Sequence, residues 1–138
     1  MPTTDLDASL SRLDALAAGL VYSSEGDHPF HTVQLGTGVD EPLTEARVRE
    51  LLALPADAPV AVVGVERVLG RHTIFTDPFD LEAQAIRPRY EAIVRFFEGE
   101  LADSVAIRTG CAPAIDVWIL GRTPAGKMIG YRTVAIET

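Results

Sequence analysis

The chain has 138 residues, of which 47% are hydrophobic, and a formal net charge of −8. This length fits a single domain over residues 1–138, and the hydrophobic fraction excludes a disordered chain. The acidic balance argues against direct binding of nucleic acid, which needs a basic surface, and leaves two interpretations: simple solubility or a basic protein partner.

The first third of the chain predicts a helix, a loop and a strand. Residues 4–18 place leucines at helical spacing, with Thr4 as the N-cap and Gly19 at the C-terminal end. Residues 21–30 have small and acidic residues at their centre and predict a loop. Residues 31–35 alternate like a strand until a glycine-rich segment interrupts the pattern.

The middle of the chain predicts a second helix and a second strand. Thr44 is suited to cap a helix over residues 45–54, which Pro55 ends. Residues 60–65, with the sequence VAVVGV, predict a well-buried strand.

The longest predicted helix follows a segment without a clear element. Residues 66–82 predict no definite element, but residues 76–80 within them predict a turn that leads into a helix. An apolar stripe at helical spacing then runs from Ile86 to Leu101. Pro88 conflicts with an uninterrupted helix, so the helix either begins near Pro88 or is kinked there.

The last third of the chain predicts strands alone, over residues 105–108, 115–122 and 127–136. The sequence TPAG at 123–126 joins the last two as a short antiparallel hairpin. Apolar side chains on both faces of the middle strand indicate that helices cover both sides of the sheet. The expected fold is α+β, a three-layer α/β/α sandwich with a mainly antiparallel or mixed central sheet.

Several patterns for cofactor binding or catalysis are missing from the sequence. The glycine-rich segment after residue 35 lacks the third glycine of a dinucleotide loop, and neither a phosphate-binding loop nor a G-x-S-x-G elbow occurs. His28 and His31 have an H-x-x-H spacing, but Pro29 between them argues against a helical face that presents both to a metal. His72 is expected at the surface. We therefore expect no cofactor and no metal site in the chain itself.

The remaining reactive side chains support weaker alternatives. Cys111 is expected to be a packed or half-exposed thiol, because no histidine lies near it in the sequence. Asp77, Asp80 and Glu82 could hold a cation, although they fit the capped start of a helix better. A small enzyme that combines one of the histidines with Asp77 or Asp80 stays open as a hypothesis.

Location follows from what the sequence lacks. No apolar run reaches the length of a membrane span, and the first residues are acidic where a signal peptide needs basic ones. We therefore expect a cytoplasmic protein without contact to a membrane.

Two sequence blocks are similar to a known family. They read GLVY, SE and HPF over residues 19–30, and IDVWILG, TPAG, G and IET over residues 115–138. In order and spacing they resemble the nuclease A inhibitor-like proteins, small bacterial inhibitors of sugar-non-specific endonucleases. The resemblance covers residues 4–138. It implies an α/β/α sandwich that is not an enzyme and that binds a DNA/RNA non-specific endonuclease as a monomer in a 1:1 complex.

The resemblance also implies the contact residues. In the family, a glutamate of the first loop and the C-terminal threonine are presented to the divalent metal of the nuclease, and the matching residues here are Glu25 and Thr138. The Mg²⁺ ion would therefore belong to the partner. Ser24 and Asp27 are expected to hold the loop through bonds to the backbone, and Glu137 adjoins the terminal contact.

Asp77 is a further expected contact and marks a departure from the family. One family member has an Asp-Trp step before the third helix, whereas Asp77 is followed here by Pro78 and Phe79. An aromatic anchor is therefore missing or replaced by Phe79. This departure keeps an alternative open, in which the chain is a binding module of the same fold for another basic partner protein.

Overall fold

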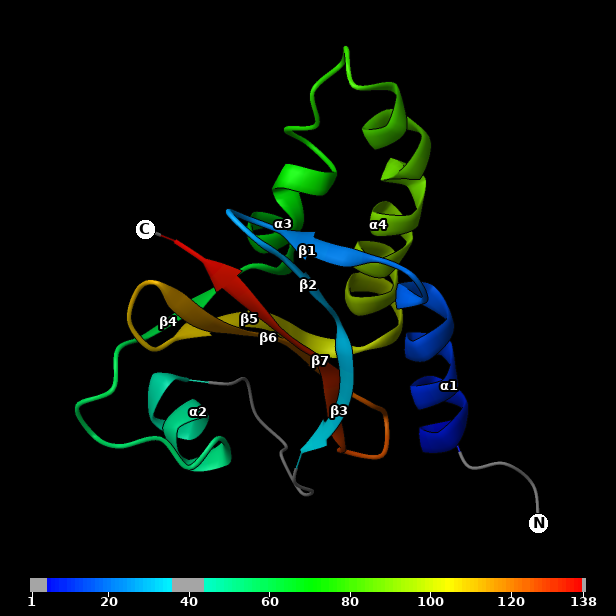
Figure 1. Ribbon diagram of the computed structural model, residues 1–138. Coiled ribbons are helices and arrows are strands. Elements are labelled where there is room, and N and C mark those ends of the chain that lie inside the picture. Colours follow the sequence, from blue (N-terminus) through cyan, green and yellow to red (C-terminus); the bar gives the residue numbers. More distant parts are fainter. Residues whose placement is uncertain (1–4, 36–43, 138) are drawn as a thin grey trace.

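The structure is a computed structural model that describes residues 5–35 and 44–137 (Figure 1). Its elements, in chain order, are α1 (Asp5–Ala17), β1 (Val21–Ser23), β2 (Asp27–Pro29), β3 (His31–Leu35), α2 (Glu45–Leu51), β4 (Val60–Val63), α3 (Val65–Leu69), the 3₁₀ turn η1 (Gly70–His72), α4 (Leu81–Glu100), β5 (Ala102–Thr109), β6 (Ala114–Arg122) and β7 (Met128–Ile136).

Five of the strands form one sheet in the order β3-β7-β6-β5-β4. Every neighbouring pair in this sheet is antiparallel. The strands β1 and β2 form a separate antiparallel ribbon. The predicted α+β class with an antiparallel sheet is therefore confirmed.

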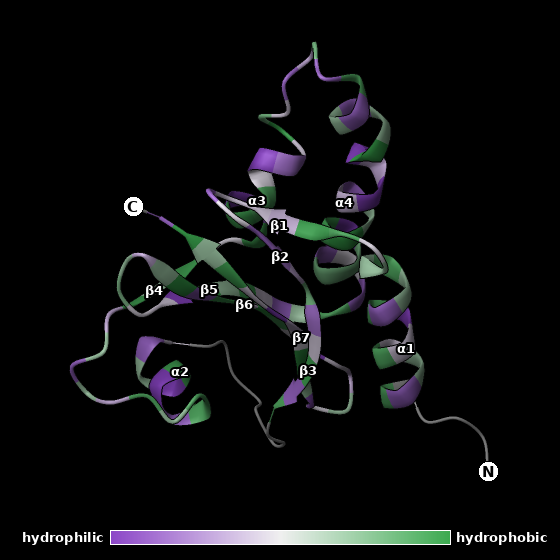
Figure 2. Cartoon of the chain, viewed as in Figure 1, coloured by the Kyte–Doolittle hydropathy of each residue, from purple (hydrophilic) through white to green (hydrophobic). Residues whose placement is uncertain are grey.

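Both faces of the sheet carry buried apolar side chains. Successive side chains of a strand point to opposite faces, so neighbours on β6 belong to different clusters. On β6, Val117 and Ile119 join a buried cluster that contains residues of α1, α3 and α4. Their neighbours Trp118 and Leu120 join a second cluster, built around Val48 of α2. Figure 1 shows α2 across the sheet from α3 and α4, and Figure 2 shows hydrophobic residues along the strands and on part of each helix.

The first helix and the last hairpin are as predicted. Helix α1 ends at Ala17, and Gly19 has a positive φ of 77°, which suits a helix C-terminus. Thr4, its predicted cap, lies outside the described residues. The hairpin between β6 and β7 has Gly126 at φ 83°, and the Gly126 N–H donates to the Thr123 carbonyl oxygen at 2.9 Å.

The segment over residues 21–30 is not the predicted loop. It is the β1–β2 hairpin, in which Tyr22 lies opposite His28. Tyr22 is buried, and its ring meets the Phe30 ring edge-on with 6.3 Å between centroids. The hairpin is therefore fixed by packing of its aromatic side chains rather than by an alternating sequence pattern.

Two predicted boundaries in the middle of the chain are wrong. Helix α2 has the predicted Thr44 cap, whose Oγ1 accepts from the Arg47 N–H at 3.2 Å, but it ends at Leu51, before Ala53 at φ 54°. The predicted strand over residues 60–65 ends at Val63. It lies at the sheet edge, where its residues are not fully buried, and the chain then turns into α3.

Helix α4 is longer than the apolar stripe indicates. It begins after Asp80, whose Oδ1 accepts from the Ala83 N–H at 3.0 Å, and it contains Pro88 well inside its first half. The helix therefore does not begin near Pro88. Ile86 is 38% exposed, so the buried stripe begins at Tyr90. Within the described ranges, no helix combines the length and the apolar character needed to cross a membrane.

Candidate functional site

The turn between β1 and β2 carries the predicted contact residues Ser24 and Glu25. Glu25 is exposed at this turn. The Ser24 N–H and the Ser24 hydroxyl both donate to the Gly26 carbonyl oxygen, at 3.0 and 3.1 Å. Ser24 thus closes the turn on itself, and Asp27 is exposed at the start of β2, opposite Ser23.

The same turn is attached to the end of β7. The Ile136 N–H donates to the Ser24 hydroxyl oxygen at 2.8 Å, and the Glu25 N–H donates to the Ile136 carbonyl oxygen at 3.2 Å. A Cβ added to Gly26 would lie 3.2 Å from the Ile136 side chain, so the contact is close. The turn and the last strand, which are 112 residues apart, therefore lie side by side (Figure 1).

The other side of the hairpin is held by residues of η1. The Arg71 guanidinium donates to the Ser23 carbonyl oxygen at 2.5 Å. His72 Nε2 accepts from the Ser23 N–H at 3.1 Å. The Tyr90 hydroxyl of α4 donates to the Val21 carbonyl oxygen at 2.7 Å. The backbone of the hairpin is thus fixed from both sides, which prepares the turn for binding.

The prediction that His72 lies at the surface is wrong. Its ring is partly buried and stacks on the Tyr90 ring, with centroids 4.0 Å apart and an angle of 7° between the planes. Burial, with a smaller contribution from the nearby Arg71 charge, lowers the pKa of His72 to about 4, although the Asp27 charge acts in the opposite direction. His72 is therefore neutral at pH 7, and its Nε2 can accept the Ser23 hydrogen bond.

Glu137 lies beside the turn and is committed to an ion pair. Its carboxylate accepts from the Arg108 guanidinium of β5, and its N–H donates to the Pro113 carbonyl oxygen at 2.8 Å. The Glu137 side chain is 42% exposed. Thr138, the other predicted contact at this end, lies outside the described residues.

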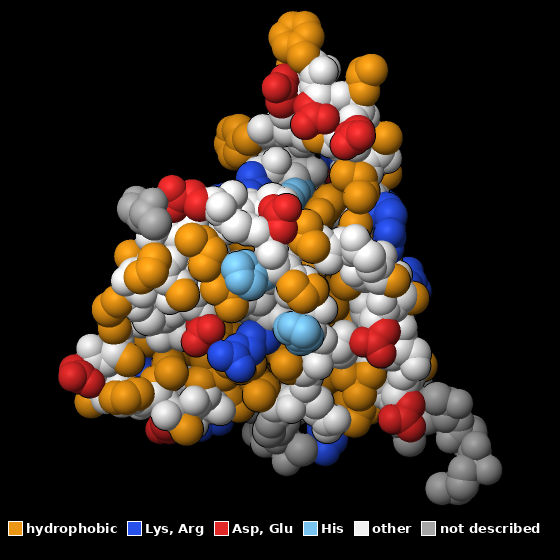
Figure 3. Space-filling model, in the orientation of Figure 1, with side chains coloured by type: hydrophobic (Ala, Val, Ile, Leu, Met, Phe, Trp, Pro, Cys, Tyr) orange, Lys and Arg blue, Asp and Glu red, His pale blue; other side chains and the backbone are white. Residues whose placement is uncertain are grey.

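Asp77 lies in a different part of the molecule, in the segment between η1 and α4. This segment forms the apex at the top of Figure 1, away from the end of β7. Asp77 Oδ1 accepts from the Phe79 N–H at 2.9 Å, and the Phe79 side chain is 90% exposed. Figure 3 shows acidic and hydrophobic side chains together at this apex. The predicted contacts therefore form two groups, one at the hairpin and one at the apex.

The described residues contain no group of three or more His, Cys, Asp or Glu side chains that could hold a metal ion. His28 and His31 lie on different strands, β2 and β3. Asp80 caps α4, as expected from its position before the helix. Cys111 is exposed.

A model of one protein family, described as nuclease A inhibitor-like protein, matches residues 7–138. This match spans nearly the whole chain and includes both the hairpin and the end of β7.

The chain belongs to the nuclease A inhibitor-like family.

Membership in the nuclease A inhibitor-like family implies the general function of a nuclease inhibitor, in agreement with a protein that is not an enzyme. A search of curated proteins finds no match to the chain. The structure also shows three residues that hold the Glu25 hairpin and that sequence analysis did not identify: Arg71, His72 and Tyr90. They lie 48 to 69 residues from their partners, so no local sequence pattern could indicate these contacts.

Proposed function

We propose that this protein is a stoichiometric inhibitor of a divalent-metal-dependent, sugar-non-specific endonuclease and blocks the active-site cleft of that enzyme. The observation that carries the proposal is the attachment of the Glu25 turn to Ile136 through two hydrogen bonds. This attachment places an exposed carboxylate beside the end of the last strand, so that both segments can enter one cleft of a partner.

The chemistry of Glu25 suits the metal of such a nuclease. Mg²⁺ prefers oxygen ligands and retains several waters in protein sites. The Glu25 carboxylate would replace or hydrogen-bond one of these waters, at the position of a phosphate oxygen of the substrate. Thr138 would add its hydroxyl and the terminal carboxylate. The metal would belong to the partner.

The net charge of −8 supports a basic partner surface. A cleft that binds phosphates attracts an acidic protein, and this attraction increases the association rate at low salt. The Debye length falls from about 30 Å at 0.01 M salt to about 8 Å at 0.15 M. We therefore expect the association rate to fall steeply over this range.

The apex is the second proposed contact. Asp77 holds the turn that presents Phe79, and the side chains of Phe79 and Leu81 are 90% and 80% exposed. Aromatic side chains, Phe among them, are enriched at protein interfaces. Phe79→Ala should weaken binding, because it removes this aromatic contact. It should not lower the stability of the fold, because the Phe79 side chain is almost fully exposed.

The test is a titration of plasmid cleavage by a purified endonuclease of this class with the wild-type protein. We expect cleavage to fall linearly and to stop at one equivalent. Glu25→Gln should weaken inhibition by at least tenfold, since it removes the charge that faces the metal. A variant without Thr138 should also be weaker.

Asp57→Asn is the matched control. It makes the same change in net charge as Glu25→Gln, at an exposed turn before β4. Equal inhibition by Glu25→Gln and the wild type would remove Glu25 from the site. No inhibition by the wild type, together with binding to a basic protein that is not a nuclease, would favour the alternative of a binding module for another partner.

A further inference from the structure

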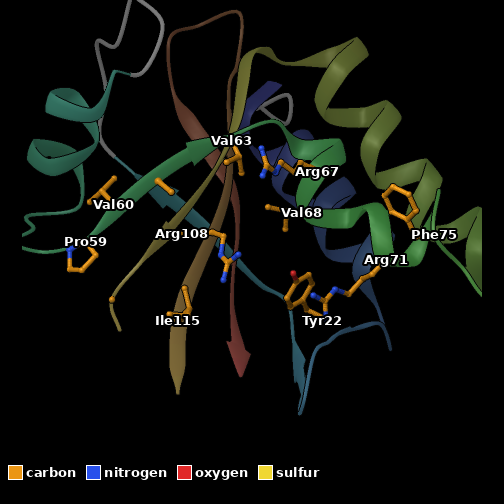
Figure 4. A pocket seen from close by; sticks show the side chains of 12 residues that line it. Tyr22, Pro59, Val60, Val63, Arg67, Val68, Arg71, Phe75, Arg108 and Ile115 are labelled. Carbon is orange, nitrogen blue, oxygen red and sulfur yellow. The ribbon is translucent and has the colours of Figure 1, made fainter. Parts of the chain in front are cut away.

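A cavity of about 560 Å³ lies between the edge of the sheet, α3 and the β1–β2 hairpin (Figure 4). Its lining comes from segments that are distant in the sequence: Tyr22 of β1, Arg67 of α3, Arg71 of η1 and Arg108 of β5. None of the residues assigned above to nuclease contact lines this cavity. The cavity nevertheless adjoins the proposed inhibitory surface, because Arg71 bonds to Ser23 and Arg108 pairs with Glu137.

The charge of the cavity differs from that of the protein. Arg67, Arg71 and Arg108 are three of only twelve basic residues in the chain, and all three line this one space. Among the described residues that line it, none is Asp or Glu. Glu137 neutralises Arg108 from the side, which leaves a local excess of positive charge. In a protein of net charge −8, this is a local field of the opposite sign.

The arginines retain donors for a ligand. A guanidinium carries five N–H donors in a planar fork. Arg71 donates one N–H group to the Ser23 carbonyl oxygen, and its guanidinium lies 5.1 Å from the centroid of the Tyr22 ring. Arg108 binds Glu137 through a single nitrogen, Nη2. Arg67 is exposed at the rim on α3. Several donors can thus point at an anion that enters the cavity.

The remaining wall is apolar. Val63, Val68 and Ile115 line it, and the Phe75 ring lies at the side of η1 with 80% of its surface exposed. A small inorganic ion would leave most of these surfaces in contact with water. A molecule with an apolar body and one anionic group would cover the wall and meet the arginines at once.

We propose that this cavity binds a small organic anion, in which a phosphate or carboxylate group on an apolar body meets Arg67, Arg71 and Arg108. Planar guanidinium groups bind both phosphate and carboxylate oxygens in bidentate fashion, so the shared chemistry is that of an oxyanion. This inference does not depend on nuclease inhibition.

The experiment is a titration of the ¹⁵N-labelled full chain, followed by amide chemical shifts, with four probes. Phenyl phosphate and benzoate carry the two anion types on one aromatic body, benzyl alcohol lacks the charge, and inorganic phosphate lacks the body. We expect phenyl phosphate or benzoate to shift the amides of Val68 and Gly110 with saturation. The better of the two should bind at least tenfold more tightly than benzyl alcohol and inorganic phosphate, and the comparison between them identifies the preferred group.

Two variants test the location. Arg67→Ala should weaken binding by about tenfold, because it removes a charge-assisted contact at an exposed position that the fold does not need. Ala61→Phe should abolish binding, because this exposed residue of the edge strand also lines the cavity and its new ring would fill it. Arg47→Ala, at a half-buried position of α2 across the sheet, is the control and should bind like the wild type.

Three results would overturn the proposal. The first is the absence of saturable shifts with both organic anions at 10 mM, a concentration about tenfold above a Kd of 1 mM. The second is equal affinity for inorganic phosphate and phenyl phosphate, which would show that the apolar wall does not contribute. The third is unchanged affinity in Arg67→Ala and Ala61→Phe, which would place the ligand elsewhere.

Discussion

His72 holds the backbone of the Glu25 hairpin, and its replacement gives a quantitative test of that role. In His72→Phe an aromatic ring can still stack on Tyr90, but the acceptor for the Ser23 N–H is lost. Leaving this partly buried donor without a partner should cost about 1–2 kcal/mol. His72→Ala loses the stacking as well, which is worth about 0.5–1.5 kcal/mol, so its total cost should be about 1.5–3.5 kcal/mol.

The pH dependence follows from the lowered pKa of His72. The pKa is 6.5 in the unfolded chain and about 4 in the folded protein. Between these values the unfolded chain binds a proton that the folded protein does not, so stability falls as the pH falls from about 6.5 towards 4. The difference in pKa corresponds to at most about 3–4 kcal/mol, which solvent screening of a partly exposed ring reduces to about 1–2 kcal/mol.

The assay is urea unfolding at pH 7.5, 6.0 and 4.5, followed by the fluorescence of Trp118, the single tryptophan. The wild type should exceed His72→Phe in stability by about 1–2 kcal/mol at pH 7.5. The difference should approach zero at pH 4.5, because only the wild type has a residue 72 that takes up a proton on unfolding. The many carboxylates titrate in both proteins and cancel in the difference. A variant as stable as the wild type at pH 7.5, or a difference that does not depend on pH, would refute the reasoning.

Three further substitutions test the packing of the fold by urea unfolding. Gly130→Ala should prevent stable folding, because the new Cβ would lie 1.8 Å from a backbone oxygen of β6. Gly99→Ala is its control: the new Cβ meets nothing within 4 Å, so this change should stabilise α4 by about 0.5–1 kcal/mol. Tyr131→Phe should cost about 1–2 kcal/mol, since it removes the buried hydroxyl that donates to the Leu13 carbonyl oxygen at 2.5 Å. Asp80→Ala should cost about 1 kcal/mol through loss of the α4 cap, and an unchanged midpoint would show that the cap is not used.

The elements that could be predicted are those fixed by local patterns. The β6–β7 hairpin follows from alternating strands around a Gly126 turn, and α1 follows from leucines at helical spacing. A short sequence motif identifies Ser24 and Glu25 as candidate contacts. Their hydrogen bonds to Ile136 are seen only in the structure.

The remaining features depend on contacts between distant segments. The residues of β1 and β2 have no alternating pattern, and their pairing is supported by His72 and by the end of β7. The sequence at 60–65 does not indicate that the chain turns into α3 at Gly64. It also does not indicate that β4 lies at the sheet edge, because edge position depends on the order of all the strands. Pro88 is accepted inside α4, where the cap at Asp80 and the packing of the helix outweigh its local cost.

The order of the strands has a consequence for how the molecule is made. In the sheet, β3 pairs with β7 alone, and Tyr131 of β7 bonds to a residue of α1 that is 118 positions away. Pairings of such high sequence separation form slowly, since a long loop must close before any contact rewards it. During synthesis, α1 and the β1–β2 hairpin therefore cannot form their contacts with the sheet until β7 has been made. The Glu25 turn takes its final position only when that strand docks, so an incomplete copy of the chain would not present the proposed inhibitory surface.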